Sequence, residues 1–138
     1  MKRIMFLMLA AVLSIVTGCS VSGHNTGSSD TAKSYTQISQ EEAKEMMAKD
    51  DGHIVVDVRR QDEYDAGHIP GAILIPNESI GTEQPKELPD LDQIILIYCR
   101  SGNRSKQAAQ KLCNMGFTNI YEFGGINTWT GEIVTDPE

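Results

Sequence analysis

Short apolar runs alternate with segments of helical periodicity along most of this chain of 138 residues. The apolar runs 54–58, 72–75, 94–98 and 120–123 are typical of strands, and the segments 40–49, 61–66 and 104–115 of helices. Short strands separated by helices favour right-handed βαβ units, which build a mainly parallel sheet. We therefore expect an α/β fold with helices flanking the sheet.

Local signals support these boundaries. Ser39 and Glu42 have the spacing of a capping box at the start of the first predicted helix. The run 94–98 is wholly apolar or aromatic, as expected for a strand covered on both faces. Asn114 and Gly116 provide a stop for the helix that begins near Arg104.

The N-terminus has the pattern of an export signal. Lys2 and Arg3 precede the uncharged apolar run 4–16, which is short for a membrane span and suits the core of a signal peptide. The run ends in Val16-Thr17-Gly18-Cys19, which resembles the lipobox of bacterial lipoproteins. That resemblance implies removal of residues 1–18 and acyl chains on Cys19, which would anchor the protein to a bacterial membrane outside the cytoplasm, in the periplasm or at the outer cell surface. The alternative is an ordinary signal peptide or an uncleaved anchor.

Residues 19–34 are rich in Ser, Gly and Thr and have no aromatic side chain before Tyr35. Such a segment buries too little apolar surface to order itself, so we expect a flexible linker. A linker of this length reaches roughly 20 Å, enough to lift a domain off a lipid surface. The sequence thus predicts one folded domain, residues 35–138.

Charge and cysteine content exclude some classes of function. The net charge is −7, and −9 without Lys2 and Arg3, so nucleic acid is not an expected partner. The three cysteines, Cys19, Cys99 and Cys113, are too few for a disulfide framework. The sequence predicts no cofactor and no metal site.

The candidate active site is the loop Tyr98-Cys99-Arg100-Ser101-Gly102-Asn103-Arg104-Ser105. Cys99 follows a predicted strand and precedes a predicted helix, and ligands of parallel sheets bind at that edge. Gly102 lets backbone N–H groups turn toward one centre, and the helix N-terminus adds partial positive charge. Together with Arg100 and Arg104, these groups should lower the pKa of Cys99 and make its thiolate a nucleophile that also binds an anion.

Several motifs then point to a family. Val55–Arg59 (VVDVR), Glu63–Ala72 (EYDAGHIPGA), the cysteine loop and Gly124–Trp129 (GGINTW) occur in the order found in single-domain rhodaneses, which this chain resembles along nearly its whole folded length. The resemblance implies a sheet of about five strands. It also implies that Cys99 takes a sulfane sulfur as a persulfide from an anionic donor such as thiosulfate. The acceptor would be a thiol or a persulfide, on a small molecule or on a protein.

The resemblance also implies roles for the other loop residues. Arg100, Ser101, Gly102, Asn103, Arg104 and Ser105 would bind the donor. Arg104 could instead pair with an acidic residue. Asp57 and Arg59 lie on the same side of the sheet, where they either brace the loop or contact substrate. For His68 we expect a structural role, for Trp129 a place in the core or in a lid, and for Cys113 burial as a small hydrophobe.

Three alternatives remain open. Cysteine phosphatases and arsenate reductases also surround an anion with Cys and Arg, but phosphatases place Arg six positions after Cys, where this chain has Ser105. A Cys–His pair as in cysteine proteases would need His53 or His68, and neither has a local context that marks it. A membrane-tethered sulfur carrier or binding module that serves one partner protein could have an identical loop.

Overall fold

The computed structural model describes residues 33–136, which form a five-stranded sheet with helices on both faces. The strands are β1 (Thr36–Gln37), β2 (Ile54–Asp57), β3 (Ile73–Leu74), β4 (Ile94–Cys99) and β5 (Asn119–Gly125). Their order in the sheet is β1-β5-β4-β2-β3, and every neighbouring pair is parallel. The predicted α/β fold with a parallel sheet is therefore confirmed.

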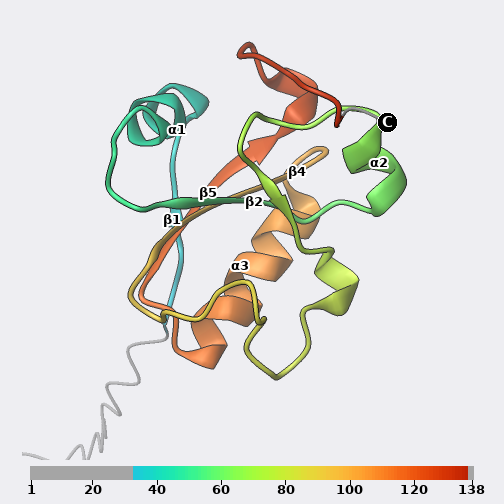
Figure 1. Ribbon diagram of the computed structural model, residues 1–138. Coiled ribbons are helices and arrows are strands. Elements are labelled where there is room, and N and C mark those ends of the chain that lie inside the picture. The colour runs from blue at the N-terminus through green and yellow to red at the C-terminus, as the bar shows by residue number, and fades with distance from the viewer. Residues whose placement is uncertain (1–32, 137–138) are drawn as a thin grey trace, which may run out of the picture. The chain divides into compact units, whose positions relative to one another are not determined.

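The helices α1 (Gln40–Met47) and α3 (Asn103–Met115) lie on opposite faces of the sheet, while α2 (Gln61–Asp65) lies beyond one end (Figure 1). Two short 3-10 helices, η1 (Asn77–Ser79) and η2 (Ile126–Thr128), complete the fold. The capping box at Ser39 is present, since Ser39 Oγ accepts from Glu42 N and Glu42 accepts from Ser39 N. Within residues 33–136, no helix is long and apolar enough to cross a membrane.

Strand β4 supplies both halves of the core. Ile95, Ile97 and Cys99 pack on the α3 side, whereas Leu96 and Tyr98 pack on the α1 side. All five are at most 1% exposed. Alternation of side chains along a strand explains this division. Burial on both faces explains why the sequence of β4 is an unbroken apolar run.

The structure refines three of the predicted boundaries. The first helix ends at Met47, the helix after Cys99 starts at Asn103, and Gly124 and Gly125 belong to β5 instead of ending it. Strand β1 was not predicted, because two exposed polar residues carry no apolar periodicity. The signal segment, Cys19 and most of the predicted linker lie outside the described residues.

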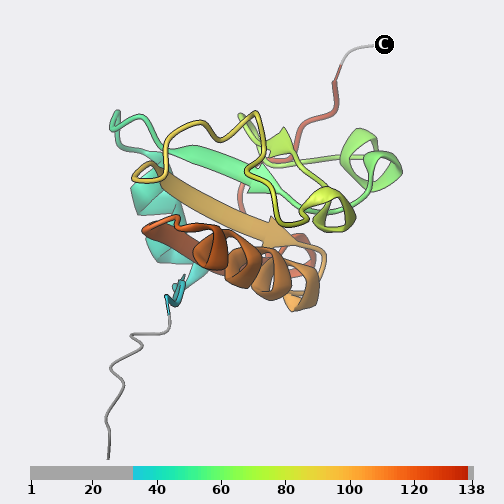
Figure 2. The same cartoon turned by 90° about the horizontal axis from the view of Figure 1, so that it is seen from below.

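The topology places the carboxyl ends of β2 and β4 at one edge, where α2 and the start of α3 also lie (Figure 2). This is the edge at which ligands of parallel sheets bind. Cys99, the last residue of β4, is located there.

Candidate active site

Cys99 is buried at the end of the central strand β4, with 1% of its surface exposed. Its Sγ accepts a hydrogen bond of 3.0 Å from the N–H of Gly102. The register between β4 and β5 shifts between Ile97 and Cys99, so that Cys99 lies opposite Gly125. This irregularity turns the chain from the strand into the loop that surrounds the sulfur.

Two glycines give the loop its shape. Gly102 has φ 105°, in the left-handed region that glycine adopts most easily, and the chain enters α3 directly after it. Gly125 lies against the loop from β5, and a Cβ built on it would be 2.1 Å from the carbonyl oxygen of Arg100. That carbonyl also accepts a hydrogen bond of 3.2 Å from Asn127 N. Close approach of two backbone segments thus explains Gly125, whereas Gly124 is explained by its φ of 91°, in the left-handed region.

The environment of Cys99 favours the thiolate. Burial alone would raise the pKa of Cys99. Hydrogen bonds from the Ser105 hydroxyl and from the backbone N–H groups of Ser105, Gly102 and Ser101 outweigh burial and leave the pKa below its ordinary value. The predicted anion-binding loop thus stabilises the negative charge on sulfur mainly with neutral donors.

The two arginines of the loop differ. Arg104 binds Glu63 of α2 through two hydrogen bonds, Nη1 to Oε2 at 2.7 Å and Nη2 to Oε1 at 2.9 Å. Arg104 is therefore the partner of an acidic residue, which was one of the two predicted roles. Arg100 is exposed and forms no ion pair with any residue that the structure describes. Ser101 and Asn103 are exposed as well.

Ser105 and Glu122 are the most buried polar pair at the loop. Ser105 is fully buried, Glu122 is 2% exposed, and Ser105 Oγ lies 2.6 Å from Glu122 Oε1. Sequence reasoning identified Ser105 but missed Glu122. The available signal was a single acidic residue inside the otherwise apolar stretch Ile120–Phe123.

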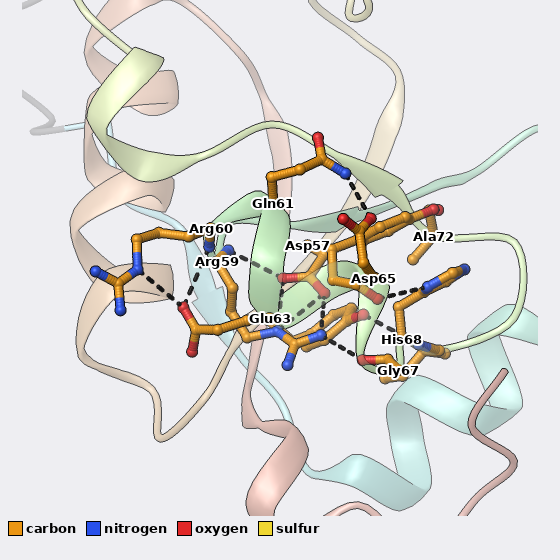
Figure 3. A network of polar contacts seen from close by, with 12 residues as sticks. Asp57, Arg59, Arg60, Gln61, Glu63, Asp65, Gly67, His68 and Ala72 are labelled. Carbon is orange, nitrogen blue, oxygen red and sulfur yellow. Dashed lines mark hydrogen bonds and ion pairs between the residues drawn. The ribbon is translucent and has the colours of Figure 1, made fainter. Parts of the chain in front are cut away.

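Asp57 and Arg59 form a buried ion pair at the end of β2. Arg59 Nη2 lies 2.6 Å from Asp57 Oδ2 and 2.7 Å from the carbonyl oxygen of Gly67. Figure 3 shows Arg59 between these two partners. Arg59 N and Nε donate to the same carboxylate. Burial opposes the charge of Arg59, but Asp57 more than offsets it and raises the pKa of Arg59. These contacts tie β2 to the chain after α2. Bracing of the cysteine loop and contact with substrate both stay predictions for this pair.

The histidines of the described region have other partners than Cys99. The ring of His68 stacks on Tyr64 with centroids 3.7 Å apart, and its Nδ1 lies 3.0 Å from the carbonyl oxygen of Tyr64. His53 Nδ1 lies 2.6 Å from Asp51 Oδ1. The structure therefore gives no support to a Cys–His pair.

Cys113 and Trp129 belong to the packing of the domain. Cys113 is 2% exposed within the core cluster on the α3 side, and burial raises its pKa. Cys99 and Cys113 are both free. Trp129 is partly buried against Phe123, with ring centroids 5.7 Å apart. Cys113 is thus a core residue, as expected, and Trp129 packs at the edge of the core.

Comparison with known proteins identifies this arrangement. The family model described as the rhodanese-like domain matches residues 39–132, the span that holds both the sheet and the cysteine loop. The chain belongs to the rhodanese-like domain family. The matched residues include the motifs on β2 and β5 and the cysteine loop between them.

Rhodanese-like relatives occur among curated proteins. The chain is 38% identical over 96 residues to thiosulfate sulfurtransferase GlpE of Pseudomonas entomophila, covering 69% of this chain and 84% of that protein. It is 36% identical over 106 residues to the "Putative sulfur carrier protein YrkF" of Bacillus subtilis, covering 76% of this chain. The matched part spans 56% of the length of YrkF.

Solved rhodanese structures share the fold. A rhodanese from E. coli with anions superposes with a TM-score of 0.56 at 30% identity, covering 61% of this chain and 99% of that one. A rhodanese-like domain protein from Staphylococcus aureus gives a TM-score of 0.63 at 28% identity, covering 74% of this chain and 99% of that one.

Proposed function

We propose that this protein is a sulfurtransferase that carries a sulfane sulfur on Cys99. The observation that carries the proposal is the buried Cys99 sulfur, which accepts the Gly102 N–H at 3.0 Å and has a lowered pKa at the ligand-binding edge of the sheet. GlpE, which shares 38% identity with this chain, is named a thiosulfate sulfurtransferase. These features support a nucleophilic thiolate that becomes the point of sulfur attachment.

Loading is a displacement at sulfur. The Cys99 thiolate attacks the outer sulfur of thiosulfate, a Cys99–sulfur bond forms, and the sulfur–sulfur bond of thiosulfate breaks. Sulfite leaves with the electron pair of that bond, and Cys99 becomes the persulfide anion Cys99–S–S⁻. The total charge stays at −3, and no external oxidant or reductant is needed.

The same loop suits the persulfide. The donors that stabilise the thiolate, N–H groups of Ser101, Gly102 and Ser105, surround the end of β4 where the added sulfur would sit. The exposed Arg100 adds positive charge near the entrance for an anionic donor. Release reverses the chemistry, since an acceptor thiolate attacks the outer sulfur, takes it as its own persulfide and restores the Cys99 thiolate.

The proposal is tested by the mass of the full-length protein after incubation with thiosulfate. We expect a gain of one sulfur atom that disappears on addition of cyanide, which leaves as thiocyanate. Cys99→Ser should gain nothing, while Cys113→Ser, the matched control, should load like the native protein. Absence of the adduct from the native protein, or its presence in Cys99→Ser, contradicts the proposal.

A dedicated sulfur carrier is the second candidate, and the 36% identity to YrkF favours its consideration. The two candidates differ in what discharges the persulfide. An enzyme turns over repeatedly with thiosulfate and a small acceptor such as cyanide or dithiothreitol. A carrier loads once and discharges to a partner protein much faster than to small thiols, so single-turnover and steady-state rates separate the two.

We also propose that residues 1–18 are a signal peptide, that Cys19 carries lipid, and that residues 19–34 link it to the domain 35–138. Support comes from the sequence alone, namely the basic start, the apolar run and the Val16–Cys19 motif. Expression in bacteria with a labelled fatty acid tests it. Label on the native chain but not on Cys19→Ala is the expected result, and label on both or on neither contradicts it.

A further inference from the structure

A buried acidic side chain lies directly beneath the cysteine loop. Glu122 is 2% exposed and accepts three hydrogen bonds. Its Oε1 accepts from Ser105 Oγ at 2.6 Å and from Gly124 N at 2.9 Å, and its Oε2 accepts from Gln37 Nε2 at 3.1 Å. All three donors, from α3, β5 and β1, are thus directed at one buried carboxyl group.

This carboxylate has no cation against it within the region that the structure describes. Arg104 of α3 is held by Glu63, and Lys44 of α1 lies over the ring of Trp129. Glu42 of α1 is bound to Ser39. A buried negative charge without a counter-ion is costly, so its presence at this point calls for an explanation.

Cys99 and Cys113 both lie in the core cluster on this side of the sheet, and Cys99 is the one at the loop. Glu122 is the register partner of Ile97 on β4, and Cys99 follows two residues later on the same face. Gly102 of the loop lies next to both residues: a Cβ built on it would be 3.8 Å from Glu122 Oε1, and its N–H donates to Cys99 Sγ. Two negative charges this close in a buried setting oppose each other.

Ser105 connects the two groups. Its hydroxyl has a single proton, and its shortest contact is with Glu122 Oε1, ahead of Gly102 O at 3.0 Å and Gly124 O at 3.4 Å. A hydrogen bond to a carboxylate is stronger than one to a neutral acceptor. The Ser105 hydroxyl is also among the groups that lower the pKa of Cys99, and donation to the sulfur would require the same proton.

We propose that Glu122 is a positioning residue that competes with Cys99 for the Ser105 proton and opposes negative charge on the sulfur. The loop donors promote the thiolate, and Glu122 limits how far they do so. The next step rests on the proposed function. Glu122 opposes the negative charge of the persulfide anion as well, and so favours transfer of the outer sulfur to the acceptor. Glu122 thereby balances loading of Cys99 against its discharge.

The test is the pH dependence of Cys99 alkylation by neutral iodoacetamide in the full-length protein, followed at Cys99 by peptide mass. In Glu122→Gln, we expect the midpoint to fall by about one pH unit, as for removal of a nearby like charge. The exposed Glu45→Gln variant, which loses the same net charge elsewhere, should keep the native midpoint. An unchanged or raised midpoint in a folded Glu122→Gln overturns the proposal, because a merely structural role lowers melting temperature without that shift.

A double-mutant cycle isolates the part that Ser105 transmits. If Ser105 connects the groups, Glu122→Gln shifts the midpoint less in a Ser105→Ala background than in the native one. Equal midpoint shifts in the native and Ser105→Ala backgrounds would show that Glu122 and Cys99 do not compete for the Ser105 proton. Should Glu122→Gln not fold, the carbon signal of the Glu122 carboxyl in native protein gives the answer. The chemical shift of this signal should change at the pH midpoint of Cys99 ionisation in native protein and should not change there in Cys99→Ser. A native signal that does not change at that pH overturns the proposal.

The effect on sulfur transfer is measured on protein preloaded with thiosulfate. Glu122→Gln should discharge to dithiothreitol several-fold more slowly than the native protein, and equal or faster discharge overturns this part. Failure of both proteins to load contradicts the proposed function instead. The alkylation result is independent of loading, so the two failures are distinguishable.

Discussion

Glu63 holds Arg104 by two hydrogen bonds, 2.7 and 2.9 Å long, and so links α2 to the first turn of α3. Two parallel bonds fix the plane of the guanidinium group as well as its position. Arg104, one of the two loop arginines considered as ligands of the anion, therefore connects two elements that flank Cys99. This contact connects the stability of the active-site edge to the ionisation of Glu63.

The first prediction concerns pH. Arg104 lowers the pKa of Glu63 from 4.5 to about 2. A depressed carboxylate pKa stabilises the folded state above the unfolded value, near 4.5, and that stability is lost as pH falls through 2. We expect Glu63→Gln to lower the free energy of unfolding by about 1 to 3 kcal/mol at pH 7. The difference from native protein should shrink between pH 5 and pH 2, as measured by urea unfolding.

The matched control for Glu63→Gln is Asp62→Asn, its exposed neighbour, which removes a charge from the same helix. This control should change stability by less than about 0.5 kcal/mol at every pH. A difference between native protein and Glu63→Gln that stays constant from pH 7 to pH 2 would contradict the assigned ion pair.

The second prediction concerns the close approach of β5 to the loop. A methyl group at position 125 would lie 2.1 Å from the Arg100 carbonyl oxygen, and backbone cannot yield as a flexible side chain can. Gly125→Ala should therefore displace the loop, with a loss of about 3 kcal/mol or more and slower alkylation of Cys99. Gly81→Ala is the control, because nothing lies within 4 Å of its added Cβ. Similar melting temperatures for the two variants would show that the loop can move aside.

Elements that depend on local sequence could be predicted, whereas contacts between distant residues could not. Strand β4, helix α3 and the placement of Cys99 follow from apolar periodicity and from the Gly102 turn, which are local properties. Arg104 and Glu63 are 41 residues apart, and their pairing depends on how α2 packs. Glu122 was missed because one acidic residue in a strand looks solvent-facing until the partners Ser105 and Gln37 are placed. The strand β1 depends in the same way on the neighbour β5.

The third prediction concerns the second thiol. Cys113 is 2% exposed, and burial raises its pKa, whereas Cys99 has a lowered pKa. Native protein at pH 7 should therefore react with iodoacetamide at Cys99 at least tenfold faster than at Cys113, by the thiolate fraction alone. The ratio should approach one in 6 M guanidinium chloride, where both thiols are exposed. Comparable native rates would mean that the core around α3 opens readily.

The fourth prediction concerns the ion pair at the end of β2. Asp57 is fully buried and Arg59 is 5% exposed, so removing one charge leaves the other without a counter-ion in the interior. Asp57→Asn preserves the shape of the side chain but should lower the free energy of unfolding by about 3 to 5 kcal/mol. Chemical denaturation of the native protein and the variant measures this loss.

The double variant Asp57→Asn/Arg59→Met separates charge from shape at the same position. With the guanidinium gone, no unpaired charge remains, so the double variant should be more stable than Asp57→Asn alone. It should nevertheless lose the bond from Arg59 to the Gly67 carbonyl, and with it the link between β2 and the chain after α2. A double variant less stable than Asp57→Asn would show that this link, and not the charge balance, is the main contribution of Arg59.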